Sequence, residues 1–418
     1  MRNPLLSKKI SGFFLASIIP LFIASCVNTP HENNNASETP KPKLPARDTT
    51  LRKTADTTKV WEDEDFGKIT FDRKFNDISR YIAGMKAWPG SPYSKLENDS
   101  VWLRFHKNFD YSWNQIAVSR LEPMYTWGIA ELSQERKSNL DIFYPLSGPD
   151  ILHANIFFPD AKNYRLFALE INGALPNLNQ MGTKTIENYI NAVYTSLGDV
   201  FKRSYFITHK MSAELTAENV NGTLPLICIF LVRTGHEIIN LKYFHLNDNG
   251  TLTPLPPDSL GTHYNDLVKV YFKNSKNNSI QMVSYLKCDL SDEAYQKNVA
   301  LQNFFTRMSV STTYLKSASY LLHYNFFSSI RNIILSKSKT VLEDDTGIPF
   351  KYFPNNKWLV SLYGVYITPV SDFSGVFQTD LLQAYNDTLI TKPKKLPFSL
   401  GYHWGTNKQN LIKAQLKG

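Results

Sequence analysis

Cysteine is scarce in this sequence: three occur among 418 residues, at positions 26, 228 and 288. They form no C-x-x-C pair and no Cys/His cluster, which argues against a structural zinc site. The chain also lacks G-x-G-x-x-G, a P-loop, H-E-x-x-H and G-x-S-x-G. No metal or cofactor is therefore expected from sequence motifs.

A long apolar run that could cross a membrane is also missing at the start of the chain. The apolar stretch 10–25 is shorter than the about 20 apolar residues that a spanning helix needs, and Pro20 interrupts it. Arg2, Lys8 and Lys9 precede it. This order, basic and then apolar, is typical of a secretory signal peptide.

The end of that stretch, "IASC" at 23–26, resembles the lipobox of bacterial lipoprotein precursors. The resemblance implies cleavage between Ser25 and Cys26, diacylglycerol on the Cys26 thiol and acylation of the new amine. A thiolate is the nucleophile that such lipid transfer requires, and two or three acyl chains anchor a protein firmly. Val27 is not acidic, which favours the outer membrane, facing the periplasm. The alternatives are an ordinary secretory signal with an incidental cysteine and an uncleaved anchor.

Acidic residues do not balance the basic ones: the formal charge is +9, and three of the positive charges lie within residues 1–25. The basic residues are scattered, with "KPKK" at 392–395 as the densest run, so no nucleic-acid partner is expected. Residues 26–60 contain few apolar side chains and predict a lipidated cysteine with a disordered tether. Residues 61–418 are expected to form a single large globular domain.

Periodicity indicates both helices and strands after residue 61. The run "LPLICIFLVR" at 224–233 is almost entirely apolar, as in a strand that is covered on both faces. With a strand and a helix before it, this run predicts a right-handed crossover to a parallel neighbour. The predicted helices are 71–86, 100–135 (started or kinked at Pro123), 183–206, 291–308 (capped by Ser291) and 312–337 (with a break near Asn325). The predicted strands are 164–172, 224–233, a hairpin at 238–255, 267–272 pairing with 279–288, 339–345 and 357–368.

The fold class expected from these elements is α+β or α/β, with a mixed central sheet, helices packed on it and a mainly helical N-terminal part. Cys228 and Cys288 both fall at predicted strand positions. They either form a disulfide, which an oxidising periplasm permits, or remain two small buried thiols.

Acidic residues lie in three stretches that also contain glycine and proline, and two of these stretches follow predicted strands. Asp150 and His153 lie in "SGPDILH", Glu170 ends a predicted strand, and Asp344 and Asp345 follow another. Parallel sheets bind ligands outside the carboxyl ends of their strands. If the strands are neighbours, these carboxylates crowd together and favour a hydrolase or divalent-cation site. The alternative is that the loops are ordinary turns, with Asp capping backbone amides.

Two further binding hypotheses concern a serine and the aromatic residues. Ser147, Asp150 and His153 are a candidate nucleophilic triad, although the members of known triads come from distant segments. Tyr and Trp in "AWPGSPY" at 87–93 and "YHW" at 402–404 are candidates for stacking on a glycan.

The segments "YPLSGPD", "ALEINGALP" and "DDTGIPFKYF" resemble bacterial envelope lipoproteins of no assigned activity, so the resemblance implies no activity. The sequence therefore predicts a lipid-anchored envelope lipoprotein with a binding or assembly role, whose partners are membrane lipid and a glycan or an envelope protein. The alternative is a periplasmic or outer-membrane hydrolase that uses the acidic loops on a glycan or another envelope substrate.

Overall fold

The computed structural model describes residues 66–137, 140–206, 220–256, 261–274, 276–387 and 392–418. All of them belong to one compact unit, residues 56–418. Cys26, the predicted signal peptide and the predicted tether lie outside the described residues.

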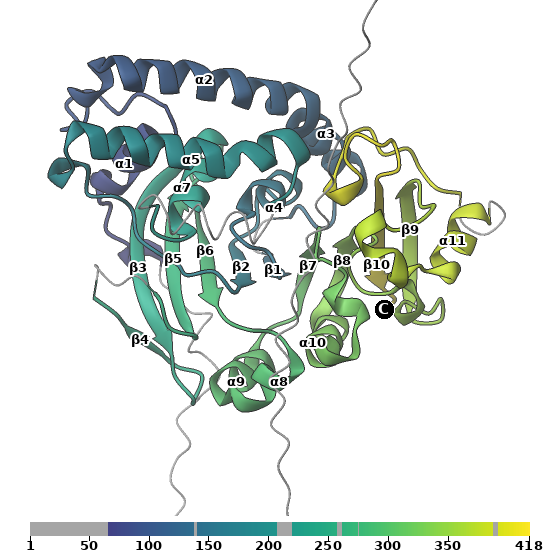
Figure 1. Ribbon diagram of the computed structural model, residues 1–418. Coiled ribbons are helices and arrows are strands. Elements are labelled where there is room, and N and C mark those ends of the chain that lie inside the picture. Colours follow the sequence, from purple (N-terminus) through teal and green to yellow (C-terminus); the bar gives the residue numbers. More distant parts are fainter. Residues whose placement is uncertain (1–65, 138–139, 207–219, 257–260, 275, 388–391) are drawn as a thin grey trace, which may run out of the picture. The chain divides into compact units, whose positions relative to one another are not determined.

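A ten-stranded mixed sheet organises this unit, with the order β4-β3-β5-β6-β2-β1-β7-β8-β10-β9 (Figure 1). Neighbours from β6 to β8 are parallel, and the other pairs are antiparallel. The predicted mixed sheet with packed helices is therefore confirmed. The strands are β1 (Asp141–Pro145), β2 (Asn163–Ala168), β3 (Glu237–Leu246), β4 (Leu252–Pro254), β5 (Asp266–Lys273), β6 (Ile280–Lys287), β7 (Ser311–Leu315), β8 (Ser338–Glu343), β9 (Trp358–Gly364) and β10 (Asn410–Leu416).

Helices cover both faces of the sheet (Figure 1). One core cluster joins a sheet face to α1, α2, α3, α4, α5 and α7, and a second joins the opposite face to α8, α9 and α10. A smaller cluster packs α11 against β9 and β10. The helices are α1 (Arg73–Ile82), α2 (Ser100–Ile116), α3 (Glu122–Glu131), α4 (Ile151–Phe157), α5 (Thr183–Arg203), α7 (Leu224–Arg233), α8 (Asp292–Lys297), α9 (Val299–Arg307), α10 (Ser328–Lys337) and α11 (Thr379–Asn386).

Several local predictions hold and can be traced to caps and turns. The hairpin β3–β4 and the pair β5–β6 form as expected. Ser291 caps α8, because its side chain accepts a hydrogen bond from the Ala294 amide. A π-helical stretch, Ala117–Leu121, joins α2 to α3, so the predicted helix 100–135 forms from Ser100 to Glu131 with an irregular turn just before Pro123.

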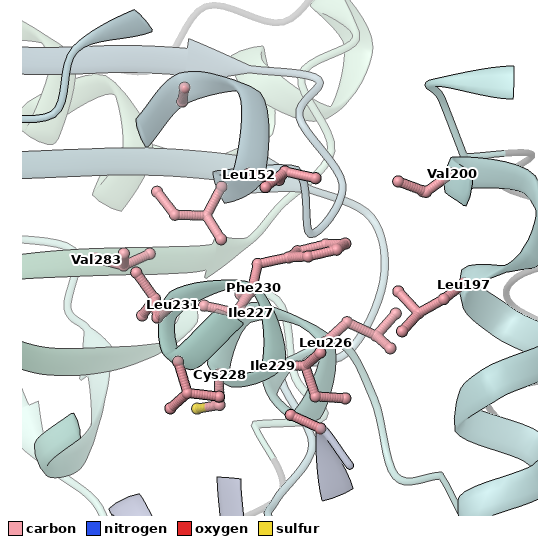
Figure 2. Close-up of a cluster of buried hydrophobic side chains, with 14 of the residues drawn as sticks. Leu152, Leu197, Val200, Leu226, Ile227, Cys228, Ile229, Phe230, Leu231 and Val283 are labelled. Carbon is pink, nitrogen blue, oxygen red and sulfur yellow. The ribbon is translucent and has the colours of Figure 1, made fainter. Parts of the chain in front are cut away.

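The predicted strand at 224–233 is wrong, because this segment is helix α7. Eight of the nine residues from Leu224 to Val232 are at most 1% exposed, and the ninth, Pro225, is buried in the first turn, where proline is tolerated. Figure 2 shows α7 enclosed by side chains of α5, α4 and β6. A helix that is apolar all round is a buried helix. The predicted crossover to a parallel strand at 224–233 is therefore also wrong. The parallel neighbours of β2 are β6 and β1.

The predicted helix at 312–337 is wrong in its first part. Residues 311–315 form the central strand β7, which lies between β1 and β8, and only Ser328–Lys337 form an α-helix. The strand "STTYL" is rich in β-branched and aromatic residues and is buried throughout, which fits its interior position.

Candidate functional site

Five parallel strands end at one edge of the sheet. Across the sheet these strands lie in the order β6-β2-β1-β7-β8. If the five are counted along the chain, this spatial order reads third, second, first, fourth, fifth. The strand order reverses between β1 and β7. Doubly wound sheets of this order bind ligands outside the carboxyl ends of the strands, at this reversal. The predicted acidic loops all begin at this edge.

A cavity of about 110 Å³ opens at this edge, lined by the residues that follow β1, β2, β6 and β7. Backbone strain is concentrated around it: Leu146, Ser317 and Ser319 line it and have φ of 59°, 51° and 53°. Non-glycine residues rarely adopt such angles, and strained residues cluster at ligand sites. Tyr402 helps to hold this loop, because its hydroxyl is 2.7 Å from Ser319 Oγ and donates to the Ser317 carbonyl at 3.1 Å. Tyr402 thus supports the cavity wall through its hydroxyl.

The charge of the cavity is acidic. Glu170 and Asp289 are the charged residues in its lining, and no Lys, Arg or His contributes to it among the residues that the structure describes. Burial raises the pKa of Glu170, and the Tyr285 hydroxyl donates to its Oε2 at 3.4 Å. Ser317 Oγ is buried and has no hydrogen-bond partner within the described chain. The cavity therefore offers carboxylate acceptors beside apolar walls.

An ion pair lies at the carboxyl ends of β1 and β7, where the strand order reverses. Lys316, directly after β7, donates to Asp150 Oδ2 at 2.6 Å and to the Ser204 carbonyl at 2.7 Å. Both charged side chains are at most 4% exposed. Burial opposes ionisation of Asp150, but His153 and Lys316 keep its pKa below the usual range. Asp150 also caps α4 by accepting the His153 amide at 3.3 Å.

His153 is the third member of this network. Its Nδ1 is 2.6 Å from Asp150 Oδ1, and its Nε2 is 3.1 Å from Ser204 Oγ. Burial lowers the pKa of His153 and the charge of Lys316 lowers it further, whereas the Asp150 carboxylate opposes this shift. Ser204, His153 and Asp150 thus follow one another in the order of a nucleophilic triad, and the Lys316 ammonium lies 3.0 Å from the same Nδ1 of His153. Ser147, the serine predicted for this role, donates to the Gly148 carbonyl instead. Ser204 is completely buried, however.

Asp344 and Asp345 are adjacent but have separate partners. Asp344 accepts hydrogen bonds from the Ser317 amide and from Thr346. Asp345 accepts from Tyr320 and Asn410. Both carboxylates are at most 4% exposed. Burial, together with the neighbouring carboxylate, raises the pKa of Asp344 to about 6. Through these hydrogen bonds the two carboxylates hold neighbouring loops together. This agrees with the alternative interpretation of the sequence, in which the acids stabilise turns.

The structure thus brings the predicted residues to one edge but divides them into three groups. Glu170 faces the cavity, Asp150 and His153 belong to the buried network, and Asp344 and Asp345 tie loops together. Lys316 links the last two groups electrostatically, because its charge interacts with Asp150 and Asp344. No three Asp, Glu, His or Cys side chains in the described ranges are arranged to hold a metal ion.

Sequence reasoning missed Lys316, Ser204, Ser317 and Asp289. Asp289 could have been found, because it follows a strand as Glu170 does. Lys316 and Ser317 were hidden by the incorrect helix at 312–337, and no sequence signal marks Ser204. The two cysteines that the structure describes, Cys228 and Cys288, are free and buried, which leaves the interpretation as buried thiols.

Comparison with protein families, with curated proteins and with solved structures gives no match. Among the described residues, no helix combines the length and the apolar character needed to cross a bilayer.

Proposed function

We propose that this protein is a lipid-anchored lipoprotein of the bacterial cell envelope that binds a small hydroxylated ligand in the cavity at the carboxyl edge. The anchor rests on the lipobox-like residues 23–26. The binding role rests on one observation, the coincidence of a cavity, strained backbone and the carboxyl ends of parallel strands.

The ligand chemistry follows from the position of Glu170. In sheets of this strand order, an acidic residue about 20 residues beyond the first loop accepts a hydrogen bond from the ribose 2′-hydroxyl, whose neighbour in the ring is the 3′-hydroxyl. Glu170 follows the second parallel strand and lies 22 residues after Gly148. This is an analogy at the level of fold. The shared chemistry is a pair of neighbouring hydroxyls, which a nucleoside or a sugar supplies.

Calorimetric titration of the protein with adenosine and, separately, with N-acetylglucosamine distinguishes the two sources of hydroxyls. The proposal is supported if one of the two compounds binds and if Glu170→Gln weakens its affinity at least tenfold. Glu122→Gln is the control, since Glu122 is exposed on α3 away from the cavity lining. Binding that is unchanged by Glu170→Gln, or no binding of either compound, contradicts it.

A hydrolase is the second candidate, and the chain Ser204–His153–Asp150 is the observation that favours it. This activity requires that Ser204 becomes accessible. A fluorophosphonate probe should then label the native protein, and Ser204→Ala should abolish labelling. Lack of labelling in the folded protein removes Ser204 as the nucleophile of such a hydrolase.

The anchor has its own test. Cys26→Ser should abolish incorporation of radioactive palmitate and release the protein from the membrane fraction. A variant that still carries label and sediments with membranes would show that Cys26 is not the anchor.

A further inference from the structure

We propose that the cavity at the carboxyl edge selects against phosphorylated ligands, so that its ligand is a free nucleoside or sugar. This inference rests on the proposed binding function and names the ligand class more narrowly. Sheets of this order commonly bind phosphates, which makes the exclusion a property of this chain's own residues.

The usual phosphate position is already occupied by an anion. Phosphates in such sheets lie on the free amides at the start of the helix after the first strand. Here that helix is α4, which has only seven residues, and Asp150 caps it. The Asp150 carboxylate accepts the His153 amide and is ionised beside Lys316. A phosphate would have to displace a buried carboxylate that is already paired with its own cation.

Among the residues that the structure describes, no Lys, Arg or His lines the cavity to replace that helix terminus. Glu170 and Asp289 supply the only charges in the lining among the described residues. Lys316 is buried and donates to Asp150 and Ser204. At an effective dielectric constant of 20, one negative charge about 8 Å from one carboxylate weakens binding about thirtyfold. The repulsion is larger for two carboxylates and for a phosphate that carries two negative charges, so binding is weakened further.

The loop after β1 also differs from a phosphate-binding loop. Glycine-rich loops let the backbone approach a pyrophosphate closely. The stretch "PLSGPD" contains one glycine, Gly148. Leu146, which has a large side chain, is one of the residues that line the cavity. The loop thus lacks the run of glycines that lets a backbone approach a pyrophosphate closely.

The experiment compares each neutral compound with its phosphate by calorimetric titration: adenosine with adenosine 5′-monophosphate, and N-acetylglucosamine with its 6-phosphate. The neutral member should bind at least tenfold more tightly at low salt, and the ratio should shrink as salt rises, because ions screen the repulsion. Asp289→Asn should narrow the ratio several-fold. The asparagine keeps the Oδ1 atom, which accepts a hydrogen bond from the Ser291 amide at 2.8 Å. Glu122→Gln should leave the ratio unchanged.

The outcomes separate the two proposals. If a phosphorylated compound binds as tightly as its neutral partner, the selection is wrong and the binding function stands. If Asp289→Asn leaves the ratio unchanged, the lining carboxylates do not cause the selection and the argument fails. If none of the four compounds binds, the proposed function fails together with the selection.

Discussion

Lys316→Met tests whether the ion pair at the strand reversal is structural. The Lys316 ammonium lies 2.6 Å from Asp150 Oδ2, and both side chains are at most 4% exposed. Removing one member of a buried ion pair costs about 3–5 kcal/mol, because the other charge remains without compensation. We expect the free energy of unfolding at pH 7 to fall by about 4 kcal/mol. A neutral partner should repair this, so the double variant Lys316→Met, Asp150→Asn should recover at least about 2 kcal/mol.

Urea unfolding followed by tryptophan fluorescence measures these differences in a double-mutant cycle. The pH dependence supplies an independent check. Without Lys316, the folded-state pKa of Asp150 rises, so the folded variant binds a proton more readily and its deficit shrinks as the pH falls. A loss below about 1 kcal/mol, an additive double variant, or a deficit that does not change with pH would refute the account of a buried, ionised pair.

Further predictions concern pH, the thiols and α7. The pKa of Asp344 is raised to about 6 in the folded state, so its contribution to stability is present at low pH and is lost as the pH rises from about 4 through 6. Asp344→Asn should flatten this part of the stability profile measured by urea unfolding. Cys228 and Cys288 are buried, and burial raises the pKa of Cys228 to about 12, so both thiols should react with Ellman's reagent only after unfolding. Ile227→Ala in α7 should cost about 2–5 kcal/mol in urea unfolding, whereas Val118→Ala, at a residue 64% exposed, should change stability by less than about 0.5 kcal/mol. A similar cost at both positions would contradict the burial of α7.

Local signals in the sequence predicted much of the secondary structure correctly. Turn residues located the hairpin β3–β4, alternation located β5 and β6, and a serine followed by acids located the start of α8. These features depend on neighbouring residues only, so a single sequence contains them. Failures came where burial is complete: "LPLICIFLVR" has no polar face, and its period cannot separate a buried helix from a buried strand.

The candidate site was predictable only in part. Glu170 was identified because a strand end followed by a glycine–proline loop is a local pattern. Its role at the cavity depends on β6 and β7, which come from more than 100 residues further along the chain. The partnership of Asp150 with Lys316 likewise joins residues 166 positions apart, and no local rule encodes it.

The amino-acid sequence by itself determined the class of fold, the turns and caps, and the motif on which the proposed lipid anchor rests, since each depends on short-range stereochemistry or composition. The tertiary structure alone decided which acids face a cavity and which are neutralised in the interior. That distinction depends on strand order, because a carboxylate has different chemistry beside a buried lysine and beside an open pocket.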